Sequence, residues 1–230
     1  AQAARINQHT KEVNMAKLFL RYAVMNAGKS TQLLQIAYDY EKNNGKRVLC
    51  LKPHVDTKAN KYIISRLENG VIRREADFLT EPEAGWLYNR IYDERAAAEK
   101  ADKPISIILI DEAQFLSKAN VWDLTRVVTY LGIPVICFAL KVDAFGEPFE
   151  GSSYLFALAQ DIEEVTTRAI CRFSKTPKKA TLHLRTVDGV PVFAGEQLSI
   201  EDDREIKYYP ICLQEYIRRY DEARGIHIKK

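Results

Sequence analysis

Residues 23–31 carry the residue types that bind the phosphates of a nucleotide. An apolar segment, residues 17–22, leads into a turn that ends in Gly28-Lys29-Ser30-Thr31, and a helical pattern begins directly after it. In such a loop, backbone N–H groups at a helix N-terminus surround an anion, a lysine reaches the outer phosphates, and a serine hydroxyl binds Mg²⁺. The predicted contacts of the ATP phosphates are Ala23, Val24, Met25, Asn26, Ala27, Gly28, Lys29, Ser30 and Thr31.

The Gly-Lys-Ser tripeptide alone is a weak signal, because it occurs by chance in roughly one chain in ten of this length. Ala23 also stands where such loops usually have their first glycine. The alternative is therefore an ordinary strand-to-helix turn. The context favours phosphate binding. Leu33 and Ala37 lie at helical spacing, and this helical pattern ends at Gly45, so that a strand, a turn and a helix follow one another as such a loop requires.

A second apolar segment ends in two neighbouring carboxylates. The run 104–110 is typical of a strand covered on both faces of a parallel sheet. Of the acids that follow it, Asp111 would lie against Mg²⁺ through water, and Glu112 would accept a proton from the attacking nucleophile. Gln114 is grouped with Asp111 as a contact of ATP and Mg²⁺. The alternative is a solvated turn with two ordinary acids.

The bulk composition is that of a globular protein. Its 230 residues, 47% of them hydrophobic, allow one large domain, or one domain with a small appendage. A net charge of +3 is too small to indicate a nucleic-acid or membrane partner, and no run reaches the length of a membrane span. Four cysteines without a Cys-x-x-Cys pair, and no secretory signal, predict a cytoplasmic location.

Strand and helix patterns alternate through the first two thirds of the chain. The expected strands are 17–22, 47–52, 105–110 and 134–139, and the expected helices are 29–43, 83–100 and 119–131. This order predicts an α/β fold, with a P-loop NTPase-type parallel sheet, flanking helices, and ligands at the carboxyl ends of the strands.

Beyond about residue 168 the pattern changes to short hairpin-like segments, 181–186 and 191–200, around a turn at Asp188-Gly189, and a helix follows near 213–224. The predicted division is a disordered leader or tag at 1–14, a nucleotide-binding α/β domain at 15–168, a small β-rich domain at 169–216, and a helix end and tail at 217–230.

Between residues 16 and 216 the chain resembles the type II thymidine kinases. The motifs that carry the resemblance are Met25-Asn-Ala-Gly-Lys-Ser-Thr31, Leu51-Lys-Pro-His-Val-Asp-Thr57, Asp111-Glu-Ala-Gln-Phe115, Gly132-Ile-Pro-Val-Ile-Cys137, Leu140-Lys-Val-Asp143, Gly146-Glu-Pro-Phe149 and Gly195-Glu-Gln197. Each motif is short, and it is their order and spacing together that make the resemblance specific.

The resemblance implies ATP- and Mg²⁺-dependent phosphorylation of the 5′-hydroxyl of thymidine, with Glu112 as catalytic base and Lys29, Ser30 and Asp111 as phosphate and Mg²⁺ residues. It implies further substrate contacts at Met25, Asp56, Lys58, Phe115, Leu140, Phe149 and Tyr208. Lys58 stands where the family usually has arginine, whose planar fork holds phosphate in two places. For Phe115 and Phe149 the alternative is plain core packing. The resemblance also implies a tetramer, and it leaves open whether dTTP feeds back on the enzyme.

The resemblance implies that the small domain is a zinc-ribbon-like lasso domain. Its sequence departs from the family in the zinc ligands and in the lasso loop. Two pairs of zinc ligands are usual, but here the pairs read Cys171 with Ser174 and Cys212 with Glu215. Because serine replaces thiolate poorly, zinc is predicted to be absent or weakly held. The usual Ile-Gly-Gly turn of the lasso reads Ile200-Glu201-Asp202, which puts base specificity in question.

Three alternatives to an active thymidine kinase remain. One is a nucleoside kinase of altered base specificity, which the changed lasso loop favours. Another is an inactive relative that binds nucleotide as a regulator, which the intact Lys29, Ser30, Asp111 and Glu112 oppose. The third is a different P-loop ATPase or a helicase, which normally needs two such domains where this chain has room for one.

Overall fold

The computed structural model of the protein describes residues 16–55, 61–67, 70–165, 169–195 and 205–228. The predicted leader, the substrate residues Asp56 and Lys58, and the altered loop at 200–202 lie outside the described residues. None of the helices in the described ranges combines the length and the apolar composition needed to cross a lipid bilayer.

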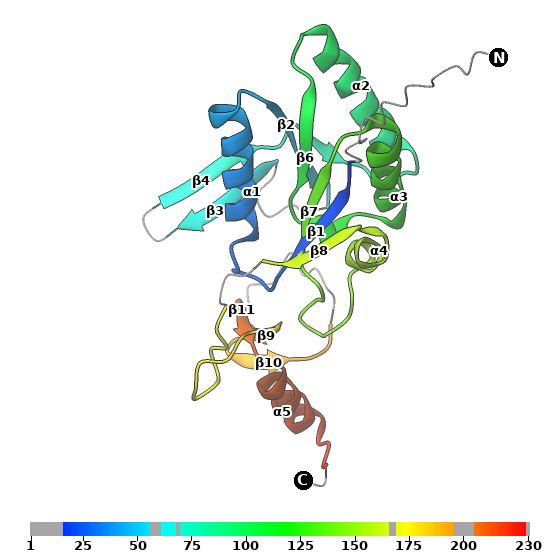
Figure 1. Ribbon diagram of the computed structural model, residues 1–230. Coiled ribbons are helices and arrows are strands. Elements are labelled where there is room, and N and C mark those ends of the chain that lie inside the picture. Colours follow the sequence, from blue (N-terminus) through cyan, green and yellow to red (C-terminus); the bar gives the residue numbers. More distant parts are fainter. Residues whose placement is uncertain (1–15, 56–60, 68–69, 166–168, 196–204, 229–230) are drawn as a thin grey trace, which may run out of the picture.

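A six-stranded parallel sheet forms the centre of the molecule (Figure 1). The sequence predicted the parallel sheet and four of its strands, but not the short edge strands β5 and β8. Its strand order is β5-β2-β6-β7-β1-β8. The strands are β1 (Leu18–Tyr22), β2 (Arg47–Pro53), β5 (Phe78–Thr80), β6 (Ile105–Ile110), β7 (Val135–Ala139) and β8 (Asp161–Glu164). β6 is almost entirely buried because helices cover both faces, which explains its continuous apolar run.

Helices flank both faces of this sheet. They are α1 (Lys29–Tyr38), α2 (Trp86–Lys100), α3 (Lys118–Arg126) and α4 (Glu150–Leu158). Figure 1 shows α1 on one face and α2, α3 and α4 together on the other. The predicted helices 29–43 and 119–131 both end in a wider π-helical turn, η1 (Asp39–Asn43) and η3 (Val127–Leu131). Two apolar clusters, one on each face, form the core.

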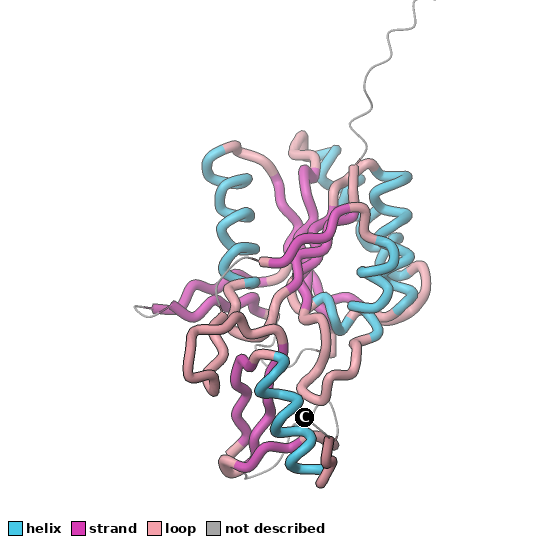
Figure 2. Tube along the Cα trace, turned by 60° about the horizontal axis from the view of Figure 1, so that its bottom comes forward, coloured by secondary structure: helices cyan, strands magenta, loops and turns pink. Residues whose placement is uncertain are grey.

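A two-stranded antiparallel hairpin, β3 (Tyr62–Leu67) and β4 (Gly70–Glu75), was not predicted from the sequence. It projects from the body beside α1 (Figures 1 and 2). The hydroxyl groups of Thr31 on α1 and Ser65 on β3 are hydrogen-bonded at 2.7 Å. The hairpin is therefore fixed to the helix that follows the phosphate loop.

The C-terminal part forms a small antiparallel sheet, β10-β9-β11, which confirms the expected β-rich region. Its strands are β9 (Leu182–Val187), β10 (Val190–Val192) and β11 (Ile206–Ile211), and α5 (Leu213–Arg224) packs on them. Asp188 and Gly189 both have positive φ, of 50° and 80°, as a tight hairpin turn requires. The domain division stays a prediction, and its last boundary, after residue 216, falls within α5.

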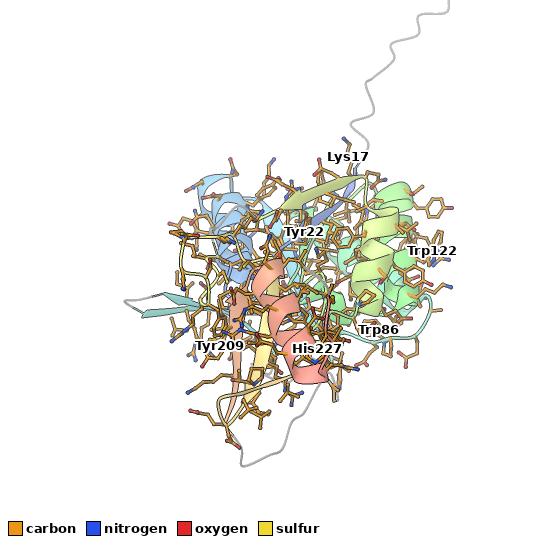
Figure 3. The ribbon with its side chains drawn as sticks, turned by 90° about the horizontal axis from the view of Figure 1, so that it is seen from below. Lys17, Tyr22, Trp86, Trp122, Tyr209 and His227 are labelled. Carbon is orange, nitrogen blue, oxygen red and sulfur yellow. The ribbon has the colours of Figure 1, made fainter. Side chains whose placement is uncertain are left out.

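Figure 3 views the molecule from the side of the small sheet. Tyr209 of β11 lies in the small domain, whereas Trp122 of α3 lies at the outer edge of the helices that cover the large sheet. The carboxyl ends of the parallel strands face the small domain (Figure 1). The candidate site lies at this junction.

Candidate active site

A cavity of about 970 Å³ lies where the phosphate loop, the end of β6, the β3–β4 hairpin and the small sheet meet. The predicted site residues that line it are Met25, Asn26, Ala27, Gly28, Lys29, Ser30, Thr31, Asp111, Glu112, Gln114, Phe115, Leu140, Phe149 and Tyr208. Ala23 and Val24 belong to the loop but not to this lining. Residues that lie far apart in the sequence are thus gathered around one space, as a nucleotide and a second substrate require.

The phosphate loop turns back on itself through left-handed backbone conformations. Asn26 has φ 59° and Gly28 has φ 81°, and α1 begins immediately after this glycine. The Lys29 side chain is buried, and its ammonium group donates to the carbonyl oxygen of Val24 at 3.1 Å. Burial lowers the pKa of Lys29, against the opposite pull of the Glu112 and Asp111 carboxylates. A buried cation of this kind is ready to receive an anionic ligand.

Ser30 and Asp111 bring two oxygen atoms together beside the loop. The Ser30 hydroxyl donates to Asp111 Oδ2 at 2.9 Å. Burial raises the pKa of Asp111 to about 7, with a further contribution from the neighbouring Glu112 charge, while Ser30 and Lys29 oppose the rise. Asp111 Oδ1 is buried and has no hydrogen-bond partner among the described residues.

These two residues have the donor chemistry that a hard divalent cation prefers. No group of three or more His, Cys, Asp or Glu side chains within the described ranges could hold a metal by itself. A site with one carboxylate, one hydroxyl and the oxygens of a bound triphosphate does not need such a group, because Mg²⁺ is commonly held in this way. The buried Oδ1 atom therefore fits a cation that arrives with the nucleotide.

Glu112 follows Asp111 in a left-handed conformation, with φ 50° and ψ 37°. It is half-buried and lines the cavity. One of its carboxylate oxygens accepts a hydrogen bond from the side-chain amide of Gln114, and the amide oxygen of Gln114 accepts from the Leu140 N–H at 3.0 Å. The carboxylate is thereby held beside the phosphate loop, which suits a group that removes a proton during phosphoryl transfer.

The other side of the cavity is largely apolar. The rings of Phe115 and Phe149 meet edge to face, with centroids 5.5 Å apart, and Leu140 lies in the same lining. Core packing and ligand contact are compatible here, because Phe149 is only 8% exposed and still lines the cavity. Tyr208 on β11 extends this wall from the small sheet. Such a surface suits a planar base.

Sequence analysis missed several residues of the lining. They are Lys52 at the end of β2, Tyr62, Ile64 and Arg66 on β3, Asp143 and Phe145 after β7, and His183 and Arg185 on β9. A charged residue inside an otherwise apolar strand was a usable signal for Lys52, which is 1% exposed. His183 and Arg185 share one face of β9 through their two-residue spacing, but the sequence does not show which surface that face meets.

Of the four positions that correspond to zinc ligands in the family, Ser174 and Glu215 have other partners. Cys171 and Cys212 contact each other within the apolar core of the small domain. The Ser174 hydroxyl donates to the Thr176 carbonyl at 2.6 Å. The Glu215 carboxylate pairs with Arg218 at 2.9 Å on the same helix. The weak or absent zinc binding stays a prediction, and it rests on the poor ligand chemistry of Ser174 and Glu215.

Comparison with known proteins gives a consistent result. A family profile described as thymidine kinase matches residues 16–216. A thymidine kinase of Lactococcus lactis is 40% identical over 204 residues, which are 89% of this chain and 98% of that protein. One of Streptococcus pyogenes is 40% identical over 202 residues (88% and 97%), and one of Streptococcus gordonii is 39% identical over 209 residues (89% and 97%). With the profile and these relatives covering most of its length, the chain belongs to the thymidine kinase family, in the type II group that its motifs resemble.

Proposed function

We propose that this protein transfers the γ-phosphoryl group of ATP to the 5′-hydroxyl of thymidine. The observation that carries the proposal is that Glu112 lines the same cavity as the phosphate loop and the apolar wall. A phosphate donor and a nucleoside that bind in this cavity would both lie within reach of that carboxylate. The family membership and the names of the relatives support thymidine as the acceptor.

The phosphate end holds ATP through the loop and Lys29. With ATP bound, the backbone N–H groups at the start of α1 would donate to the phosphates, and the Lys29 ammonium would exchange the Val24 carbonyl for a phosphate oxygen. Ser30 and Asp111 would hold Mg²⁺ there, which neutralises charge that develops on the phosphates. The contact between the Lys29 ammonium group and a phosphate oxygen is strongly favourable, because the ammonium group is already buried away from water.

Glu112 accepts the proton of the 5′-hydroxyl as the new bond from that oxygen to the γ-phosphorus forms. The bond between the γ-phosphorus and the bridging oxygen breaks, and ADP leaves with the electron pair. Most of the rate enhancement comes from holding the two substrates in line and from stabilising charge on the transferred group. Phe115 and Phe149 position the base, and with it the 5′-hydroxyl.

A tetramer and feedback by dTTP are proposed from the family resemblance, and a cytoplasmic location is proposed from the cysteine usage. The loop at 200–202 that would read the base lies outside the described residues. No observation favours the inactive regulator or the helicase-type ATPase, since Lys29, Ser30, Asp111 and Glu112 all line one cavity.

The test is phosphorylation of thymidine by ATP and Mg²⁺ with purified protein, beside Glu112→Gln and a panel of other nucleosides. The expected result is thymidine-dependent product that falls by about a hundredfold or more in Glu112→Gln. Glu83→Gln, an exposed change outside the cavity, serves as the matched control. Turnover with another nucleoside alone would correct the acceptor, and ATP binding without turnover on any nucleoside would contradict the kinase assignment.

A further inference from the structure

The turn that carries Glu112 is held in a conformation that its own sequence does not favour. Glu112 is left-handed without being glycine, and a 3₁₀ turn, η2 (Ala113–Phe115), follows it. Such a backbone conformation is costly for a residue with a side chain and persists only where the surrounding structure enforces it. The contacts that enforce it are therefore candidates for a role in catalysis.

Gln114 supplies the first of these contacts. Its side chain is 1% exposed, and its amide oxygen accepts from the Leu140 N–H at 3.0 Å. An N–H can only donate, so this bond fixes which end of the amide is the oxygen. The NH₂ end consequently faces Glu112 and donates to its carboxylate. Gln114 thus presents a donor to one oxygen of Glu112 in a fixed orientation and leaves the second oxygen for the acceptor hydroxyl.

The first turn of α4 supplies the second contact. A Cβ atom at Gly151 would lie 2.6 Å from the carbonyl oxygens of Ala113 and Leu116, and 2.8 Å from that of Gln114. These distances are too short for any side chain, so the helix backbone lies directly against the turn. The neighbouring Ser152 hydroxyl donates to the Leu140 carbonyl, which ties α4 to the residue that orients Gln114.

We propose that Gln114 is a positioning residue for the catalytic base, and that the close approach of Gly151 holds the turn in place. Gln114 then acts through Glu112 rather than on ATP or Mg²⁺, which differs from the role expected from the sequence. The inference rests on the proposed function, because it takes Glu112 as the base. It predicts that losing the Gln114 amide changes the chemical step and not the binding of either substrate.

The experiment compares two variants of Gln114 in steady-state kinetics. Gln114→Met removes both hydrogen bonds at similar size, whereas Gln114→Glu keeps an acceptor for the Leu140 N–H but places a carboxylate against Glu112. We expect kcat to fall about tenfold or more in both, with KM for ATP and thymidine nearly unchanged. The Gln114→Glu activity, relative to wild type, should rise as the pH falls, since a protonated carboxyl group donates again.

A double-mutant cycle with Glu112→Gln separates positioning from structure. If Gln114 acts through Glu112, Gln114→Met causes no further loss of kcat in the Glu112→Gln background. An equal loss in both backgrounds, or a wild-type kcat in Gln114→Met, overturns the inference while leaving the kinase assignment intact. Absence of thymidine turnover in the wild-type protein would instead contradict the proposed function.

Gly151→Ala tests the close approach independently. We expect a lower kcat, because the added methyl group must displace the turn that carries Glu112. Ser153→Ala is the matched control, since Ser153 lies on the same helix and its hydroxyl donates only locally, to the Phe149 carbonyl, at 3.0 Å. A wild-type kcat in Gly151→Ala would remove α4 from the inference. Thermal melting of each variant shows whether the fold is retained.

Discussion

The Asp111 carboxylate at the end of β6 accepts a hydrogen bond from the Ser30 hydroxyl at the start of α1, 2.9 Å away. The strands that lead to them, β6 and β1, are not neighbours, because β7 lies between them. The strand order of the sheet therefore sets the distance between these two side chains. Burial at this position raises the pKa of Asp111 to about 7.

Asp111 should make the nucleotide-free protein less stable as the pH rises. Its folded pKa of about 7 lies above the ordinary 3.8, so between these values the folded state binds more protons than the unfolded state. The free energy of unfolding then falls with increasing pH through this window. Asp111→Asn removes that dependence. We expect the Tm of the variant, relative to wild type, to increase from pH 5 to pH 8, while kinase activity is lost.

The control for this prediction is Asp93→Asn, because Asp93 is exposed on α2. Its Tm difference from wild type should stay flat over the same range. A flat difference for Asp111→Asn as well would show that Asp111 is not protonated in the folded protein near neutral pH.

Lys29→Met should abolish activity without destabilising the fold. Lys29 is 6% exposed, and burial already lowers its pKa, so replacing the ammonium by an apolar group relieves a desolvation cost. We expect kcat/KM for ATP to drop by about a hundredfold or more, with a Tm at or above that of wild type. The exposed Lys100→Met is the control. A variant that melts much earlier than wild type would show that Lys29 supports the loop itself.

Phe115→Leu should weaken thymidine binding selectively. The edge-to-face contact with Phe149 contributes about 0.5–1.5 kcal/mol beyond burial, and its loss loosens the wall on which the base is proposed to stack. We expect KM for thymidine to rise about twofold to twelvefold, which corresponds to that energy, while KM for ATP stays the same. An equal rise in both KM values would point to a general disturbance of the cavity.

Metal analysis of the purified protein should find less than one equivalent of zinc. Glu215 is already paired with Arg218, and the Ser174 hydroxyl donates to a backbone carbonyl, so the cysteines lack two good partner ligands. A strong chelator should leave the Tm unchanged. Stoichiometric zinc, together with a lower Tm after chelation, would contradict this prediction.

The parts of the site that follow each other in the chain could be predicted. The phosphate loop and the Asp111-Glu112 pair each combine a buried strand with the turn at its end, and the apolar pattern reveals that strand. The parallel sheet followed from the alternation of strands and helices. These features are local, so no knowledge of tertiary contacts was needed.

The parts that depend on distant contacts were not predictable. The β3–β4 hairpin was not predicted because it forms its own two-stranded sheet and exposes Val71 and Ile72. These exposed apolar residues interrupt the alternation of apolar and polar residues that indicates a strand. The orientation of Gln114 depends on the Leu140 N–H, which lies 26 residues away. Gly151 appears in the sequence as an unremarkable glycine, and only its distance to three carbonyl groups gives it a function.

The burial of all four cysteines, Cys50, Cys137, Cys171 and Cys212, gives the protein a practical property. Burial also raises the pKa of the Cys50 thiol to about 12, which keeps it in the unreactive thiol form. At Cys171, burial is outweighed by hydrogen bonds to Cys212 and to nearby backbone groups, which lower the pKa of that thiol. A single cysteine introduced at Tyr62, on the hairpin edge of the cavity, would then be the preferred target of a maleimide dye. Fluorescence from that position would report in real time how the hairpin responds as the two substrates bind.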